Sequence, residues 1–193
     1  MDNDRLVQVG VALVSRFGAR ALSLTSVARH AGVARATAYR MFGGRDALVG
    51  AIVDYEIGLM REKIVEWSEA EPDVPARVHA RVVNTLAYLR EHQALQYVLR
   101  HEPEELVNTL VAAEDPDGPT ILERAVDVVV ADLKDDETAV LQPNPKAALE
   151  LIARLVYSEL LVPRSVMTDQ QIADIVVRAV LPDSAPPETT LSS

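Results

Sequence analysis

The sequence predicts an all-α protein, because one kind of pattern runs through almost the whole chain. Apolar residues recur every three or four positions, as on one face of a helix, and the segments end at glycine, proline or polar turns. Of the 193 residues, 49% are hydrophobic and 25% charged, so the chain can bury a core. Aromatic residues make up only 4%, and we therefore expect that core to be aliphatic.

Charge is divided unevenly along the chain. Residues 1–50 hold seven arginines and three aspartates, a net charge of +4, whereas residues 51–193 hold twelve Lys or Arg and 26 Asp or Glu, a net charge of −14. A basic end on an acidic protein indicates contact with a polyanion. A difference of this size also arises by chance, so charge alone does not decide the function.

Residues 4–17 predict the first helix. Leu6, Val9, Leu13 and Phe17 fall on one face of it, which is the spacing of a helix that packs on a core. The residues before it are acidic and carry no apolar stretch, so we do not expect a signal peptide.

Residues 23–42 predict two short helices with a tight turn between them. Ser23 can cap the first helix by accepting from the backbone N–H of Ser26, and Gly32 stands where a left-handed residue would end it. The second helix covers residues 35–42. Such a pair is a helix-turn-helix, whose second helix enters the major groove of DNA. The same spacing also fits a basic amphipathic helix pair in an ordinary helical domain.

The rest of the chain predicts a long helix and then a helical body. Asp46 lies in the first turn of a helix that reaches about Glu69, where its charge suits the positive helix end. Breakers divide the remainder into helices at residues 76–91, at 94–101, from Pro103, and at 120–136, 146–162 and 169–181. We therefore divide the chain into a head at residues 1–45, a body at residues 46–181 and a tail at residues 182–193, which we expect to be disordered.

Several strings in the head carry a resemblance to a known family. They are Phe17, SLTSVARHAGV at 23–33, ATAYRMF at 36–42, Arg45 and Ala47-Leu48. Over about residues 5–55 the chain resembles the TetR-type (TetR/AcrR) transcriptional regulators. The resemblance implies a three-helix DNA-binding head, joined by a long helix to an all-helical ligand-binding and dimerisation body. It also implies a sequence-specific regulator, most often a repressor, that binds a duplex DNA operator as a homodimer.

The resemblance implies which head residues contact DNA. Arg35 opens the recognition helix, and arginine can hydrogen-bond guanine O6 and N7 in a bidentate manner. Thr37 and Tyr39 match positions that contact phosphate, and Arg45 matches a phosphate-binding basic residue after the recognition helix. The full set, which adds one DNA-facing and two variable positions, is Thr25, Arg35, Thr37, Tyr39, Arg40, Met41 and Arg45.

Three helix ends depart from the family pattern. Ala34 stands where Ser often caps the recognition helix, Ser26 where an acid completes a capping box, and Ala21 where Gly ends the first helix. Each departure is expected to weaken its helix end by about 0.5–1 kcal/mol.

The segment 76–136 is expected to enclose a ligand cavity. Its many aliphatic residues, with few charges in phase with them, predict a small, mostly apolar effector. We expect this effector to act through the long helix, as the only element that joins head and body, by changing the spacing of the two heads of a dimer. The expected polar anchors, each of which is also common as an ordinary helix residue, are Trp67, His79, Tyr88, His92, Tyr97 and His101.

The last two predicted helices carry more apolar surface than terminal helices need. We expect the surplus to form a four-helix bundle between two chains, although both faces could instead pack within one chain. The expected interface residues are Leu149, Ile152, Val156, Leu160, Ile172, Ile175 and Val176.

Other function classes lack their signatures. The sequence has no Gly-rich phosphate loop and no nucleophile elbow, so we do not expect an enzyme. It has no cysteine and no zinc-type histidine spacing, so we expect neither a metal nor a cofactor. It has no run of about 18 apolar residues, so we expect no membrane span and a cytoplasmic location. The alternative that remains is a helical dimeric protein-interaction module, whose binding would depend less steeply on salt than DNA binding does.

Overall fold

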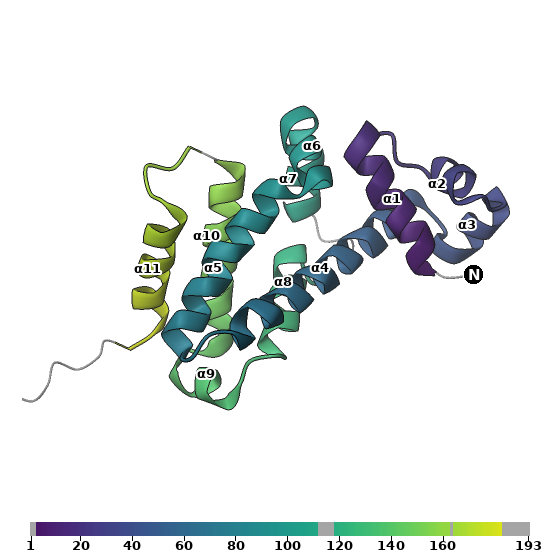
Figure 1. Ribbon diagram of the computed structural model, residues 1–193. Coiled ribbons are helices and arrows are strands. Elements are labelled where there is room, and N and C mark those ends of the chain that lie inside the picture. The colour runs from purple at the N-terminus through teal and green to yellow at the C-terminus, as the bar shows by residue number, and fades with distance from the viewer. Residues whose placement is uncertain (1–2, 112–117, 163, 183–193) are drawn as a thin grey trace, which may run out of the picture.

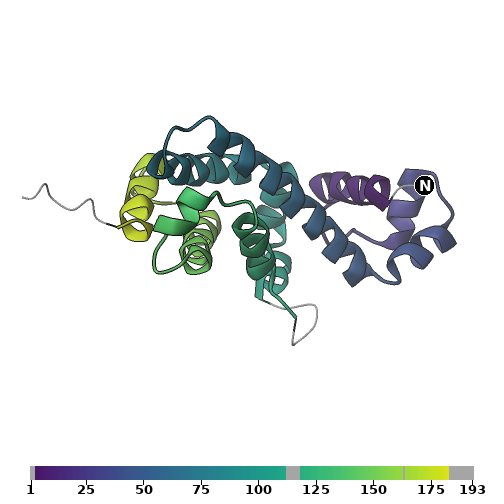
Figure 2. The same ribbon diagram turned by 90° about the horizontal axis from the view of Figure 1, so that it is seen from below.

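The structure, a computed structural model, describes residues 3–111, 118–162 and 164–182, and every regular element in these residues is an α-helix. The predicted all-α fold class is therefore confirmed. Figures 1 and 2 show an elongated molecule in which a group of short helices lies at one end and α11 (Asp169–Val180) at the other. Among the described helices, none is both long and apolar enough to cross a membrane.

The head consists of α1 (Asn3–Phe17), α2 (Leu24–Ala31) and α3 (Arg35–Phe42). The hydroxyl of Ser23 accepts from the Ser26 N–H at 3.1 Å, and Gly32 ends α2 with a φ of +69°, both as predicted. The expected weakness at Ser26 was wrong, because its hydroxyl accepts from the Ser23 N–H at 3.0 Å and so completes the capping box without an acid. Ala34 makes no capping hydrogen bond, as expected.

A long helix, α4 (Arg45–Glu69), leads from the head into the body (Figure 1). Most body helices begin at a residue whose side chain caps them, such as Asp73 before α5 and Asn144 before α10. Between α4 and α11, the body helices are α5 (Val74–Glu91), α6 (Gln93–His101), α7 (Pro103–Val111), α8 (Ile121–Val130), α9 (Asp135–Val140) and α10 (Pro145–Leu161).

The segment 120–136, predicted as one helix, is broken, and α9 starts as a separate short helix at Asp135. The break lets two acidic residues reach distant partners: Asp132 bonds Arg61 of α4, and the fully buried Glu137 bonds Arg81 of α5 at 2.6 Å. A buried carboxylate without such a partner would be costly, so these pairings favour the break over a continuous helix.

Two further details differ from or fall outside the sequence prediction. Phe17 is 52% exposed rather than buried, because the head core ends near Val14 and the Arg16 guanidinium lies over the Phe17 ring. The predicted disordered tail lies, apart from Pro182, outside the described residues.

The head and body are joined at more than one place. Besides α4, helix α6 packs on the head, and its Ala94 and Val98 belong to the same hydrophobic cluster as the buried residues of α1 and α2. The carboxylate of Glu102, after α6, accepts from the backbone N–H groups of Ala19 at 2.6 Å and Arg20 at 3.2 Å. The expectation that the long helix is the only connection was therefore wrong.

Candidate DNA-binding surface and ligand cavity

The α2–α3 pair forms the predicted helix-turn-helix. Buried Val27, Ala28, Ala31 and Ala38 hold the two helices together in the head core. Their small side chains allow the helix axes to approach closely. The opposite face of α3 is left to solvent, where a helix of this motif meets DNA.

The predicted DNA-contact residues differ in how accessible they are. Thr25, Arg35, Tyr39 and Arg40 are exposed, whereas Thr37 is half-buried. Met41 packs partly against the head core, so this side chain is less free to reach bases than the sequence suggested.

Arg35 and Tyr39 lie one turn apart on α3 and contact each other. The guanidinium of Arg35 lies 4.9 Å from the centre of the Tyr39 ring and donates to the Tyr39 hydroxyl at 3.2 Å. Stacking of this kind holds an exposed arginine in a defined direction. A directed guanidinium suits bidentate hydrogen bonding to a guanine edge.

Arg45 is held between the head and the body. It donates to the Ala19 carbonyl oxygen at 3.0 Å and pairs with Glu105 of α7 at 3.4 Å. Arg20 of the head contacts Glu104 and Glu105 of the same helix. A phosphate group would thus compete with Glu105 for Arg45.

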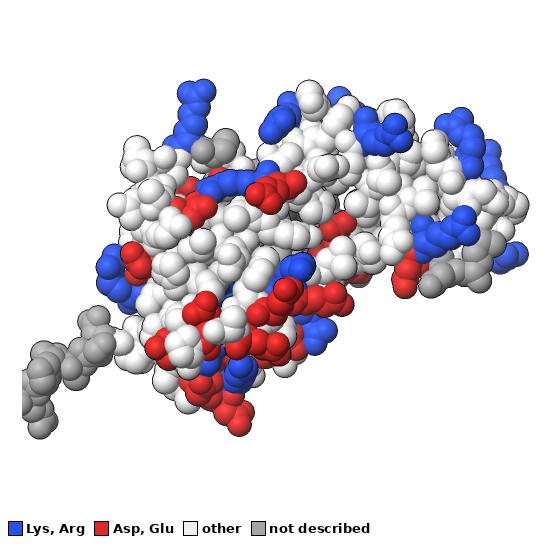
Figure 3. All heavy atoms as spheres, in the orientation of Figure 1, with Lys and Arg blue, Asp and Glu red and all other residues white. Residues whose placement is uncertain are grey.

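The surface charge follows the division seen in the sequence. On the face shown in Figure 3, acidic side chains gather over the lower part of the body near α8 and α9, whereas the charged residues of the head are mostly Lys or Arg. An acidic body repels nucleic acid, which limits contact with a polyanion to the head.

The described residues of the body enclose a large apolar cavity of about 350 Å³, a size at which proteins hold small molecules. Helices α4, α5, α6, α7, α8 and α10 contribute to its wall. Val14, Ala19 and Leu22 of the head line it as well, so the cavity reaches the head directly. The polar or charged side chains at its wall are Glu56, Arg61, Arg81, Thr85, Tyr88, His92, Glu105, Thr109 and Tyr157.

The structure brings two of the six predicted ligand anchors to the cavity, Tyr88 and His92. Trp67 does not line the cavity but packs edge-on against the Tyr88 ring, with a centroid separation of 6.2 Å. The other three anchors lie elsewhere. His79 faces Asp174 of α11, and the rings of Tyr97 and His101 contact each other beside the head.

Sequence reasoning missed the contribution of α10 to the cavity. Tyr157 lies in the cavity wall, and burial raises the pKa of its hydroxyl. Glu56 and Thr85 also line the cavity and were not singled out. No local pattern distinguishes these three residues from others on their helices. Helix α10, for example, is apolar on several sides, and only its packing decides which side meets the cavity.

The predicted dimer-interface residues lie mostly inside the protein, which corrects the sequence prediction. Leu149, Ile152, Val156 and Leu160 line the cavity, and Ile172 and Val176 pack in the core between α5, α10 and α11. Of the seven, only Ile175 is exposed, at 43%.

A different set of apolar residues on the last two helices is exposed. Leu151 of α10 is 49% exposed, close to the value for Ile175 of α11. Further apolar side chains are exposed at the end of α10 and in the turn before α11. They are Leu161, Val162, Val166 and Met167. Most of the large exposed hydrophobic side chains among the described residues therefore gather at this end of the molecule.

Comparisons with known proteins agree with this architecture. Residues 6–52 match the family model of bacterial regulatory proteins of the tetR family. No curated protein matches the sequence.

Solved structures share the fold over most of the chain. AlkX from Dietzia sp. strain DQ12-45-1b, a TetR family repressor implicated in biodegradation of n-alkanes, has a TM-score of 0.66 and 21% identity, over 91% of this chain and 90% of that chain. QsdR, a TetR family repressor of R. erythropolis, has a TM-score of 0.64 and 17% identity, over 93% of this chain and 95% of that chain. RolR, solved with resorcinol, has a TM-score of 0.62 and 13% identity, over 92% of this chain and 86% of that chain. At these identities the likeness shows the fold.

Proposed function

Because this chain belongs to the TetR family of bacterial regulatory proteins, which are DNA-binding transcriptional regulators, we propose that it is a repressor released from its operator by a small ligand. The observation that carries the proposal is the cavity wall shared by head and body. A ligand that fills the cavity touches Val14, Ala19 and Leu22, and so acts on the position of the head without an intermediary. The resorcinol complex of RolR supports a small-molecule effector on this fold.

The DNA contacts in this proposal fall into two groups. Arg35, held by Tyr39, reads a base pair, and the exposed Thr25 and Arg40 lie beside it on the same motif. Arg45 binds a phosphate after leaving Glu105. Phosphate contacts position a protein on DNA, whereas base contacts give it specificity.

The operator-binding unit is a homodimer in this proposal. Its interface is the exposed apolar surface of α10 and α11, which includes Leu151 and Ile175, in place of the buried residues named from the sequence. Two heads on a dimer must sit about 34 Å apart to reach successive major grooves. A ligand that favours a different head spacing lowers DNA affinity by its differential affinity for the two states.

Selection of bound sequences from random duplex DNA tests the proposal. We expect enrichment of a palindromic site, with affinity that falls steeply as salt rises, because several phosphates are contacted. Binding with no enriched sequence and a flat salt dependence would instead favour a protein-interaction module.

Two arginine variants then separate base readout from phosphate binding. Arg35→Ala should cost about 1–3 kcal/mol and relax preference at one base pair. Arg45→Ala, the matched control, should weaken all sites alike and reduce the salt slope by about one. If the two variants behave identically, the assignment of base readout to Arg35 is wrong.

A further inference from the structure

We propose that the effector is an organic cation with an apolar body, and that Glu56 is its counter-ion in the cavity. This inference rests on the proposed ligand-controlled function and names the chemical class of the ligand. A charged group without an oppositely charged partner is costly in an apolar space, so the charged groups of the cavity wall limit which ligands can bind.

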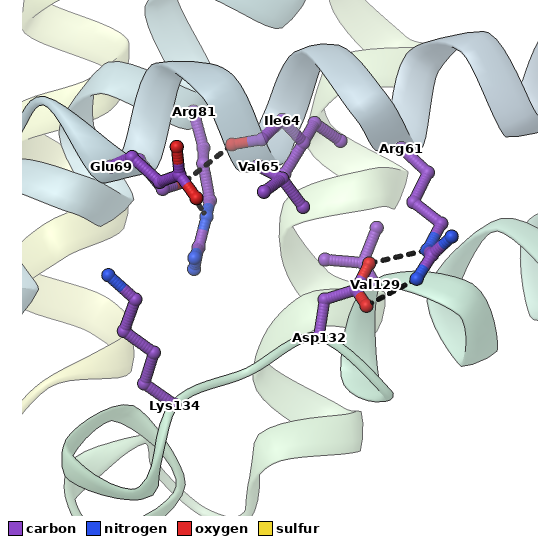
Figure 4. Close-up of a pocket in the computed structure, with 9 residues that line it drawn as sticks. Arg61, Ile64, Val65, Glu69, Arg81, Val129, Asp132 and Lys134 are labelled. Carbon is purple, nitrogen blue, oxygen red and sulfur yellow. Dashed lines mark hydrogen bonds and ion pairs between the residues drawn. The ribbon is translucent and has the colours of Figure 1, made fainter.

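Three of the four charged groups of the cavity wall already have a partner of opposite full charge. Figure 4 shows Arg61 facing Asp132, which accepts two hydrogen bonds from it at 2.5 and 2.6 Å. Arg81 bonds the buried Glu137 at 2.6 Å, and Glu105 pairs with Arg45 at 3.4 Å. These pairs leave no net charge to attract a ligand.

Glu56 differs, because its partner is a neutral histidine. The His92 Nδ1 accepts from the backbone N–H of Leu95 at 3.2 Å, so the ring proton is on Nε2, which donates to Glu56 Oε2 at 3.0 Å. The same Nδ1 caps the N-terminus of α6, so the geometry of the cap itself requires an unprotonated Nδ1. The carboxylate of Glu56 therefore faces no full positive charge, and its Oε1 accepts no hydrogen bond from the described residues.

An aromatic ring completes the site beside Glu56. Tyr88 lines the cavity next to His92, with their ring centres 5.8 Å apart, and Trp67 fixes the Tyr88 ring from its edge. Burial, and to a lesser extent the charge of Glu56, raises the pKa of the Tyr88 hydroxyl, so this side chain stays neutral. The face of a tyrosine ring attracts a cation.

The remaining wall suits the apolar part of such a molecule. Side chains such as Ile57, Met60, Leu95 and Val129 surround the space beyond Glu56. A neutral ligand would leave the Glu56 carboxylate without an opposite charge, and an anion would be repelled by it. The acidic body, with a net charge of −14 over residues 51–193, also raises the local concentration of cations.

Three compounds with one skeleton and different charge test the proposal on the full chain by isothermal titration calorimetry. They are 4-phenylbutylamine, 4-phenyl-1-butanol and 4-phenylbutanoate, which are respectively a cation, a neutral molecule and an anion at pH 7. We expect the amine to bind about tenfold more tightly than the alcohol, and the carboxylate to bind most weakly. Tightest binding by the alcohol or the carboxylate, or no binding by any of the three, would overturn the proposal.

Two substitutions assign the effect to the named residues, after thermal melting has verified that the variants fold. Glu56→Gln keeps the shape and the acceptor for His92, and should remove the preference for the amine while it leaves alcohol affinity unchanged. Tyr88→Phe keeps the ring and should retain most of the amine affinity, whereas Tyr88→Leu should lose part of it. An equal loss for amine and alcohol in Glu56→Gln would contradict the role of the charge.

The same compounds separate this inference from the proposed function. If the amine binds through Glu56 but leaves operator affinity unchanged, the cation site stands and ligand-controlled release fails. If the alcohol or carboxylate binds best and also releases DNA, release stands and the cation assignment fails.

Discussion

Glu102 is the side chain that ties the body to the head most directly. It is only 8% exposed, and one carboxylate oxygen accepts both the Ala19 and the Arg20 backbone N–H groups. Gly18 makes this contact possible. Its φ is +86°, and a Cβ at this position would collide with the Glu102 carboxylate and the Tyr97 ring. The link from α6 to the head therefore depends on a residue with no side chain.

Two glycine substitutions test this link, because both glycines have a positive φ but different surroundings. Gly32→Ala, with no atom within 4 Å of the new Cβ, should cost only the backbone strain of about 1–2 kcal/mol. Gly18→Ala should cost more, since it also displaces Glu102 and leaves two backbone N–H groups without their acceptor. Chemical denaturation of both variants gives the two costs. Equal costs would mean that Glu102 moves aside freely and does not tie the head to the body.

At the scale of elements, the recognition helix is the least well anchored helix of the head. Helix α2 is closed at its start by the Ser23–Ser26 capping box, whereas Ala34 before α3 provides no side-chain acceptor. Helix α3 has only eight residues, and an isolated helix of this length is not stable. Its order therefore depends on the packing of residues such as Ala38 in the head core.

Supplying the missing cap should stabilise the head. Ala34 is exposed and has an extended backbone, with φ −66° and ψ 139°, so a serine there can accept from the first turn of α3. We expect Ala34→Ser to raise the free energy of unfolding by about 0.5–1 kcal/mol and Ser23→Ala to lower it by about 1 kcal/mol. Urea denaturation measures both. A loss of stability in Ala34→Ser would show that the Ala34 site has no room for the hydroxyl.

At the scale of the whole molecule, two ends have surfaces of opposite character. The head exposes arginines, whereas α10 and α11 expose large apolar side chains. Figure 1 shows that these two helices lie away from the head. An apolar surface of this kind is typical of an interface between proteins. The arrangement suits a dimer that joins at its bodies and leaves both heads free for DNA.

A pair of equally exposed apolar residues tests the interface. Leu151→Glu should dissociate the dimer, because the interface would bury an unpaired charge, and operator affinity should fall as each chain then holds one half-site. The control is Val107 of α7, which is 45% exposed, against 49% for Leu151. Val107→Glu should leave the dimer intact. Sedimentation measures the mass of both variants. A dimer that persists in Leu151→Glu would place the interface elsewhere.

The helices of the head, the positions where they end and the motif they form can be predicted from local sequence. These features depend on contacts within one or two turns. The hydroxyl of Ser23 reaches an N–H three residues away, and Gly32 needs only its own left-handed backbone. Such signals are complete within a short stretch, so the predicted limits of α3 agree with the structure.

Which apolar faces are buried, and which polar groups meet, depends instead on how distant segments pack. Leu160 and Leu151 lie on the same apolar helix, yet Leu160 faces the cavity and Leu151 faces solvent. Glu56 meets His92 across 36 positions of sequence, and Glu102 meets Ala19 across 83. Periodicity shows that a helix has an apolar face, but the packing of distant segments decides what that face contacts, because burial and ion pairing depend on proximity in space.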